Sequence, residues 1–122
     1  MIKNKKTLII GATTKPERAA YRAIEMLTAK GHSVIALGQN TGEVAGIKIN
    51  TKAIPVKNID TISLYINPTR QRDYYNYIVE VKPKRVLFNP GTENSEFQAR
   101  LIAKGIEVEE ACTLVLLSTN QY

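Results

Sequence analysis

Residues 7–21 have the sequence TLIIGATTKPERAAY, which predicts a buried strand, a tight turn and the start of a helix. The turn is Gly11-Ala12-Thr13, three small residues that follow the apolar strand. Thr14 and Glu17 have the spacing of a capping box, in which each side chain satisfies a free amide of the first helical turn. Pro16 suits that turn because its missing N–H costs no hydrogen bond there. We therefore expect a helix that begins at about Pro16.

The same stretch forms a candidate anion site. The N–H groups of the turn and the positive end of the helix dipole converge at the point where the strand ends. Arg18, one turn into the expected helix, is placed to add a charge-assisted contact to a phosphate. The alternative is an ordinary strand–turn–helix connection that holds no ligand. This stretch alone leaves both interpretations open.

Length and composition predict one soluble globular domain that spans residues 1–122. The chain is 43% hydrophobic and 23% charged, which are ordinary values for such a domain. No apolar run approaches the ~20 residues that cross a bilayer, so we expect no membrane partner. The basic start, MIKNKK, is followed by a short apolar run and does not form a signal peptide. The single cysteine, Cys112, suits the cytoplasm, and the lack of a Cys/His cluster predicts no metal site.

The net charge of +6 indicates an anionic partner. Two groups of basic residues precede predicted strands, namely Lys3, Lys5, Lys6 and Lys82, Lys84, Arg85. In a parallel sheet both groups lie at the amino ends of strands, away from the edge that binds ligands. We interpret them as solvated surface rather than as a nucleic-acid patch, because no nucleic-acid motif with interleaved aromatic residues accompanies them.

Apolar runs and helical patterns alternate along the rest of the chain. The expected strands are 8–10, 33–37, 61–66, 85–88 and 106–109, and the expected helices are 16–30, 69–81, 95–104 and 113–117. The weak pattern of 46–54 predicts at most a short edge strand. This alternation predicts an α/β fold with a doubly wound, mostly parallel sheet of about five strands and helices on both faces.

Polar loops follow four of these strands, and they meet at the carboxyl edge of a parallel sheet, where ligands bind near the switch in strand order. The candidate binding residues in these loops are Gly11, Ala12, Thr13, Thr14, Lys15, Arg18, Gly38, Gln39, Asn40, Asn67, Pro68, Asn89, Pro90, Gly91 and Asn94. Arg70 and Arg72 begin a predicted helix, where cations oppose the dipole, so they either face solvent or meet a ligand anion. Of these two, we expect solvent. His32 is expected in an exposed loop at the opposite edge.

The second strand argues against NAD. A dinucleotide-binding fold for NAD has an acidic residue at the end of this strand to hold the ribose hydroxyls, and it has further glycines in the first turn. This chain has Gly38 and Gln39 at the acidic position and a single glycine in the turn. These features leave NADP open.

Four motifs in order along the chain resemble one known family. They are the Gly-Ala-Thr-x-x-Pro-x-Arg-x-x-Tyr pattern of residues 11–21, the stretch 30–35 with the Gly-Gln-Asn that follows it, the loop 88–94 and the segment 109–112. Together they are similar to the small, free-standing CoA-binding domain proteins, which are related to the CoA-binding domain of the succinyl-CoA synthetase alpha subunit. The resemblance covers nearly the whole chain and implies a Rossmann-like fold.

The resemblance also implies the ligand, which would be coenzyme A or an acyl-CoA, a small-molecule nucleotide cofactor. Its pyrophosphate would lie over Gly11–Thr14 and pair with Arg18. The adenine would lie against 38–41, and the loops at Asn67 and Asn89 would line the remainder.

A catalyst needs a nucleophile or an acid/base group near its ligand, and the sequence offers Cys112 and Glu93. We interpret both as structural, so we expect no catalytic residue and a non-catalytic CoA-binding module. Two alternatives stay open. One is an NADP- or nucleotide-dependent oxidoreductase. The other is an interaction module with a vestigial pocket, whose apolar segment 113–117 packs against a protein partner or a second copy in a homodimer.

Overall fold

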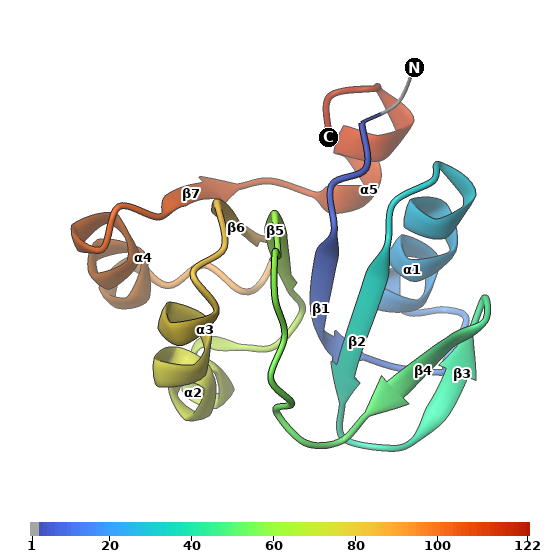
Figure 1. The fold of residues 1–122 in the computed structure, drawn as a ribbon, viewed down its shortest axis with the longest axis horizontal. Coiled ribbons are helices and arrows are strands. Elements are labelled where there is room, and N and C mark those ends of the chain that lie inside the picture. The colour runs from blue at the N-terminus through green and yellow to red at the C-terminus, as the bar shows by residue number, and fades with distance from the viewer. Residues whose placement is uncertain (1–2) are drawn as a thin grey trace.

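The computed structural model describes residues 3–122 and contains a seven-stranded sheet with helices on both faces (Figure 1). The strands are β1 (Thr7–Ala12), β2 (Val34–Gly38), β3 (Gly42–Val44), β4 (Ile47–Asn50), β5 (Thr61–Leu64), β6 (Arg85–Phe88) and β7 (Glu107–Glu110). They lie in the order β3-β4-β2-β1-β5-β6-β7, and every neighbouring pair is parallel except β3 and β4. The predicted doubly wound, mostly parallel α/β sheet is confirmed, with seven strands in place of about five.

The additional strand comes from a hairpin at one edge of the sheet. The expected edge strand corresponds to β4, whereas β3 was not predicted. Ala45 and Gly46 form the two-residue connection, with φ angles of 50° and 80°. Positive φ at both positions is what a type I′ hairpin turn requires.

The order of the strands reverses beside β1, which lies between β2 and β5. The chain winds from β1 outward through β2 to the hairpin, and then returns to place β5 on the other side of β1. The carboxyl ends of β1 and β5 therefore flank the switch point, where open α/β sheets bind their ligands.

Two hydrophobic clusters hold the helices to the sheet. The helices are α1 (Ala19–Ala29), α2 (Pro68–Gln71), α3 (Tyr75–Val81), α4 (Ser95–Ala103) and α5 (Thr113–Ser118), with a 3₁₀ turn η1 (Arg72–Tyr74) between α2 and α3. On one face, Leu8 and Ile10 of β1 pack with residues of α3 and α4. Ile9, which points the other way, packs with α1 and with Leu117 of α5. Figure 1 shows α1 and α5 on one side of the sheet and α3 and α4 on the other.

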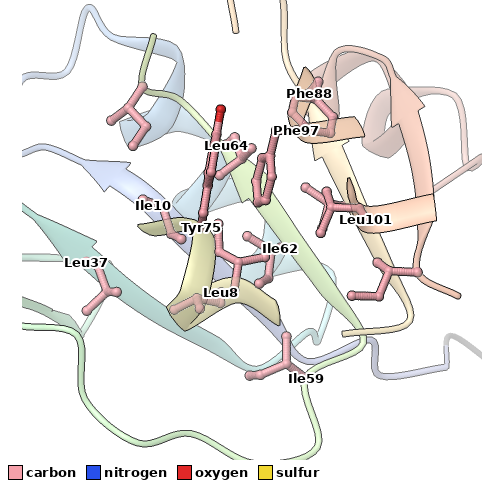
Figure 2. Close-up of a cluster of buried hydrophobic side chains, with 14 residues drawn as sticks. Leu8, Ile10, Leu37, Ile59, Ile62, Leu64, Tyr75, Phe88, Phe97 and Leu101 are labelled. Atoms are coloured by element: carbon pink, nitrogen blue, oxygen red, sulfur yellow. The ribbon is translucent and has the colours of Figure 1, made fainter. Parts of the chain in front are cut away.

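Aromatic contacts tie α3 to α4 within the first cluster (Figure 2). The rings of Tyr75 and Phe97 are stacked, with centroids 4.1 Å apart. The Phe97 ring also meets Phe88 of β6 edge-on, at 6.1 Å. Such offset and edge-on pairs add to the energy of burial itself.

Helix α1 begins later than predicted, and the capping box is wrong. Its N-cap is Arg18, whose side chain makes no capping hydrogen bond. Thr14 and Glu17 are exposed and lie before the helix. The hydroxyl of Thr13 accepts a hydrogen bond from the backbone N–H of Lys15 at 3.2 Å, so a local side-chain turn replaces the expected first helical turn.

The helix predicted over 69–81 is divided into α2, η1 and α3. Asn67 caps α2 by accepting a hydrogen bond from the N–H of Arg70. Beyond it, Tyr75 and Ile78 of α3 point into the core. A tighter 3₁₀ turn joins these two anchored segments. The helices over 95–104 and 113–117 are confirmed to within two residues.

Not all of the basic residues at the amino edge are solvated surface. Arg85 is 9% exposed, its Nε donates to the Thr61 hydroxyl at 2.7 Å, and it forms an ion pair with Glu109. His32 is also buried, and its Nδ1 accepts a hydrogen bond from the backbone N–H of Lys5 at 2.9 Å. Both predictions failed because the ring of Tyr122 covers this edge, where it contacts Arg85 and His32.

The buried His32 predicts a loss of stability on mild acidification. Burial lowers the pKa of His32, and nearby Lys5 lowers it further. The unfolded chain therefore takes up a proton before the folded domain does, so stability is complete above the ordinary pKa of 6.5 and falls as the pH drops through it. We expect the Tm to fall between about pH 7.5 and about pH 5.5. His32→Gln keeps an acceptor and does not titrate, so its Tm should fall less. Equal pH dependence of the two proteins would contradict this account.

Candidate functional site

A cleft of about 400 Å³ opens at the carboxyl end of β1, beside the switch point. It is lined by Gly11, Ala12, Thr13, Thr14, Lys15, Arg18, Ala19, Ala20, Gln39, Asn40, Tyr65 and Arg70. Three segments thus form its walls: the connection from β1 to α1, the end of β2, and the segment that follows β5.

Gly11 lies where two of these walls meet. The pairing of β1 with β2 shifts register between Ile10 and Ala12, so Gly11 is a bulge, and its φ is +102°. A Cβ at this position would lie 3.0 Å from the Cβ of Tyr65 and from the Cγ2 of Ile66. Glycine therefore serves both the backbone conformation and the close approach of β1 to the segment that follows β5.

Two more glycines let other strands approach the end of β1 and the connection that follows it. A Cβ on Gly38 of β2 would lie 2.3 Å from the carbonyl oxygen of Ala12. A Cβ on Gly42 of β3 would lie 2.4 Å from the Cγ2 of Thr14. The backbone of the cleft is consequently supported from two neighbouring strands.

The charges around the cleft favour an anion. Lys15, Arg18 and Arg70 supply three cations, and no Asp or Glu is among the lining residues. Within residues 3–122, no carboxylate forms an ion pair with any of the three. The first turn of α1 also has no side-chain cap, which leaves its N–H groups available to a ligand. The arrangement suits a phosphate.

Most of the residues predicted from the first two loops come together in this cleft. Gly38 does not line it but is buried at the end of β2, against Ala12 of the lining. Asn67 caps α2 and Pro68 is its first residue, whereas Pro90 and Gly91 are exposed in the loop after β6. None of these last four residues lines the cleft.

Asn89 and Asn94 use their side-chain amides inside the protein. Asn89 donates to the hydroxyl of Ser63 and to the carbonyl of Leu64, and its oxygen accepts from the N–H of Thr113. Asn94 donates to Gln71 and Tyr75 and caps α4. Both asparagines are buried and act as structural connections between loops.

Four lining residues were missing from the predicted site: Ala19, Ala20, Tyr65 and Arg70. The expectation that Arg70 faces solvent is wrong, because it lines the cleft. The available signal was its position in the first turn of a helix that starts at the ligand edge. Burial raises the pKa of Tyr65 to about 12, although the Thr113 and Ser63 hydroxyls act in the opposite direction. Its hydroxyl is buried near these two side chains, although no hydrogen bond joins it to either of them.

Residues 5–118 match the family described as the CoA binding domain. The chain belongs to this family. No curated protein matches the chain.

Solved structures share the fold of this CoA-binding domain. A crystal structure of an uncharacterized protein has 48% identity and a TM-score of 0.96, and the match covers 99% of this chain and 100% of that one. A hypothetical protein from Pyrococcus horikoshii OT3 has 26% identity over 96% of this chain and 84% of that one, with a TM-score of 0.85.

One more distant likeness is to a much larger protein. The dinucleotide-forming acetyl-coenzyme A synthetase 1 of Ca. Korarchaeum cryptofilum was solved in complex with phosphate and ADP. It has 16% identity and a TM-score of 0.70, and the match covers 88% of this domain but 26% of that chain. At this identity the likeness shows the fold alone.

The two candidate catalytic residues lie away from the cleft lining. Cys112 is the half-buried N-cap residue of α5. Glu93 is exposed, and its Oε1 accepts a hydrogen bond from the N–H of Gly91 at 2.9 Å. Within residues 3–122 no three His, Cys, Asp or Glu side chains gather as they would around a metal ion. None of the helices in this part of the chain is long and apolar enough to cross a membrane.

Proposed function

We propose that this domain binds coenzyme A or an acyl-CoA in the cleft at the end of β1, without catalysing a reaction. The observation that supports this most directly is a set of three cations without carboxylate partners around a cleft at the switch point. Coenzyme A carries its charge on phosphates, which such a cleft would hold. Membership of the CoA binding domain family supports the same ligand.

In this proposal Gly11–Lys15 form the phosphate-binding loop and Arg18 pairs with a phosphate. Gln39 and Asn40, at the end of β2, would face the adenosine. The rest of the ligand would pass the loops at Asn67–Pro68 and Pro90–Gly91, on the carboxyl side of β5 and β6. The single thiol of Cys112 suits a reducing compartment, so we place this binding in the cytoplasm.

The chemistry of the lining supports binding rather than catalysis. General acid–base catalysis works best when the pKa of the catalytic group lies near the operating pH. Tyr65 lines the cleft, but its hydroxyl is buried, and burial raises its pKa to about 12, far above that range. The two candidate catalytic side chains are outside the lining.

We expect Arg18→Ala to weaken coenzyme A binding. Losing one charge-assisted contact should cost about 1.5–3 kcal/mol of binding free energy. Calorimetric titration of the wild type and the variant with CoA, NADP and NAD measures this directly. Arg22→Ala is the matched control, because Arg22 is an exposed arginine on α1 outside the cleft lining.

Three outcomes would count against the proposal. Equal losses in the two variants would remove Arg18 from the site. Tight binding of NADP in place of CoA would favour a nucleotide-dependent oxidoreductase. Binding of none of the three cofactors would leave an interaction module with a vestigial pocket.

A further inference from the structure

We propose that Arg70 is a second phosphate-binding residue, which acts from the wall of the cleft opposite Lys15 and Arg18. The chemistry recognised would then be a diphosphate bridge, with one phosphoryl group held by each wall. This inference rests on the proposed function only in taking the cleft to be a nucleotide site. It goes further by assigning a role to Arg70 and by excluding monophosphates as good ligands.

The two walls come from neighbouring strands that meet at the floor of the cleft. Lys15 and Arg18 belong to the connection that follows β1, and Arg70 belongs to the segment that follows β5. Ile10 of β1 pairs with Leu64 of β5, so the two segments leave the sheet side by side. A ligand in the cleft therefore has cations on two sides.

The backbone that carries Arg70 is fixed by its neighbours. The N–H of Arg70 donates to the capping oxygen of Asn67 at 2.9 Å. The next residue, Gln71, is fully buried, and its Nε2 donates to the carbonyls of Ile66 and Thr92 at 2.9 and 2.8 Å. This amide network anchors the short helix α2, so the backbone that carries Arg70 is already in place when a ligand binds and only the side chain has to be ordered.

The side chain of Arg70 is available to a ligand. It lines the cleft, and no carboxylate within residues 3–122 forms an ion pair with it. The planar guanidinium can make two parallel hydrogen bonds to one phosphate. The next arginine, Arg72, is exposed and lies outside the lining, which makes it a natural control.

A diphosphate satisfies this arrangement better than a single phosphate. The single phosphoryl group of a monophosphate can engage either the Lys15–Arg18 wall or the Arg70 wall. The cations of the other wall then stay without an anion. Two linked phosphoryl groups can engage both walls at once. Loss of Arg70 should therefore reduce the affinity for a diphosphate much more than the affinity for a monophosphate.

Calorimetric titrations with ADP, AMP and CoA on wild type, Arg70→Ala, Arg70→Lys and Arg72→Ala test this. We expect Arg70→Ala to weaken ADP and CoA on the order of tenfold or more and AMP by no more than about twofold. Arg70→Lys should restore part of the ADP affinity, because it keeps the charge without the bidentate geometry. Arg72→Ala should leave every affinity unchanged, and circular dichroism checks that each variant is folded.

The outcomes separate this inference from the proposed function. Equal weakening of AMP and ADP in Arg70→Ala overturns the recognition of a diphosphate across the two walls. No difference between Arg70→Ala and Arg72→Ala overturns any role of Arg70, while CoA binding can still stand. ADP binding with the expected pattern in a protein that does not bind CoA supports the role of Arg70 and overturns the proposed function. No binding of any of the three ligands overturns both.

Discussion

Replacing Gly38 by alanine should lower the free energy of unfolding by about 3 kcal/mol, the upper end of the range for an added group in a packed interior. A Cβ at position 38 would lie 2.3 Å from the carbonyl oxygen of Ala12 and 3.0 Å from the Cγ2 of Ile49. The first of these atoms belongs to the backbone of β1, so no side-chain rotation can relieve the clash. The strands themselves would have to separate, at the cost of their pairing. Urea denaturation of the two proteins measures the loss.

The same variant should lose ligand affinity although Gly38 does not touch the cleft. Ala12 lines the cleft, and its carbonyl is the atom that the added methyl group would displace. The shape of the loop that we propose to bind phosphate would therefore change through the backbone. Titration with CoA at a temperature where the variant is still folded detects this effect separately from unfolding.

Gly46→Ala is the matched control for that experiment. Gly46 has a φ of +80°, but nothing lies within 4 Å of its Cβ position. The free energy of unfolding of this control should therefore fall only by the strain of a left-handed alanine, about 1–2 kcal/mol. Its affinity for CoA should stay unchanged. If the two variants are equally stable, or if Gly38→Ala is as stable as wild type, the stability of the domain does not depend on the close approach of β2 to β1.

The central strands could be predicted because they are buried on both faces and have continuous apolar sequences. β3 could not be predicted from its own residues. It consists of Gly42, Glu43 and Val44, and only the last is buried and apolar. Its strand conformation depends on pairing with β4, which no local pattern encodes. The turn at Ala45-Gly46 also lacks the asparagine that usually marks such hairpins.

The cleft could be predicted where one loop contains all of the required chemistry, as in the connection from β1 to α1. It could not be predicted where the role of a residue depends on the direction of its side chain. Asn40 and Asn89 both follow apolar strands, but Asn40 lines the cleft and Asn89 is buried. Arg70 is the converse case. A cation at a helix start suggests solvent, and only the approach of β1 to β5 places Arg70 in the lining of the cleft.

The buried amide of Asn89 leads to the second large effect. Asn89→Ala should lower the free energy of unfolding by about 3 kcal/mol, because the groups that it joins would stay buried without partners. Its Nδ2 lies 2.8 Å from the Ser63 hydroxyl and 2.9 Å from the Leu64 carbonyl, and its Oδ1 lies 2.8 Å from the N–H of Thr113. One side chain thus connects the end of β5 to the start of α5. Thermal and urea denaturation report the loss.

The effect on ligand binding decides between a structural and a binding role for this asparagine. Both N–H donors and one lone pair of the oxygen are used within the protein, and the residue is not part of the cleft lining. We therefore expect folded Asn89→Ala to keep the wild-type affinity for CoA, in contrast to Arg18→Ala. Asn76→Ala, which removes an exposed amide from α3, should change stability by less than about 0.5 kcal/mol and serves as the control. A stable Asn89→Ala protein that has lost CoA affinity would instead make Asn89 a ligand contact and would require its amide to turn toward the cleft on binding.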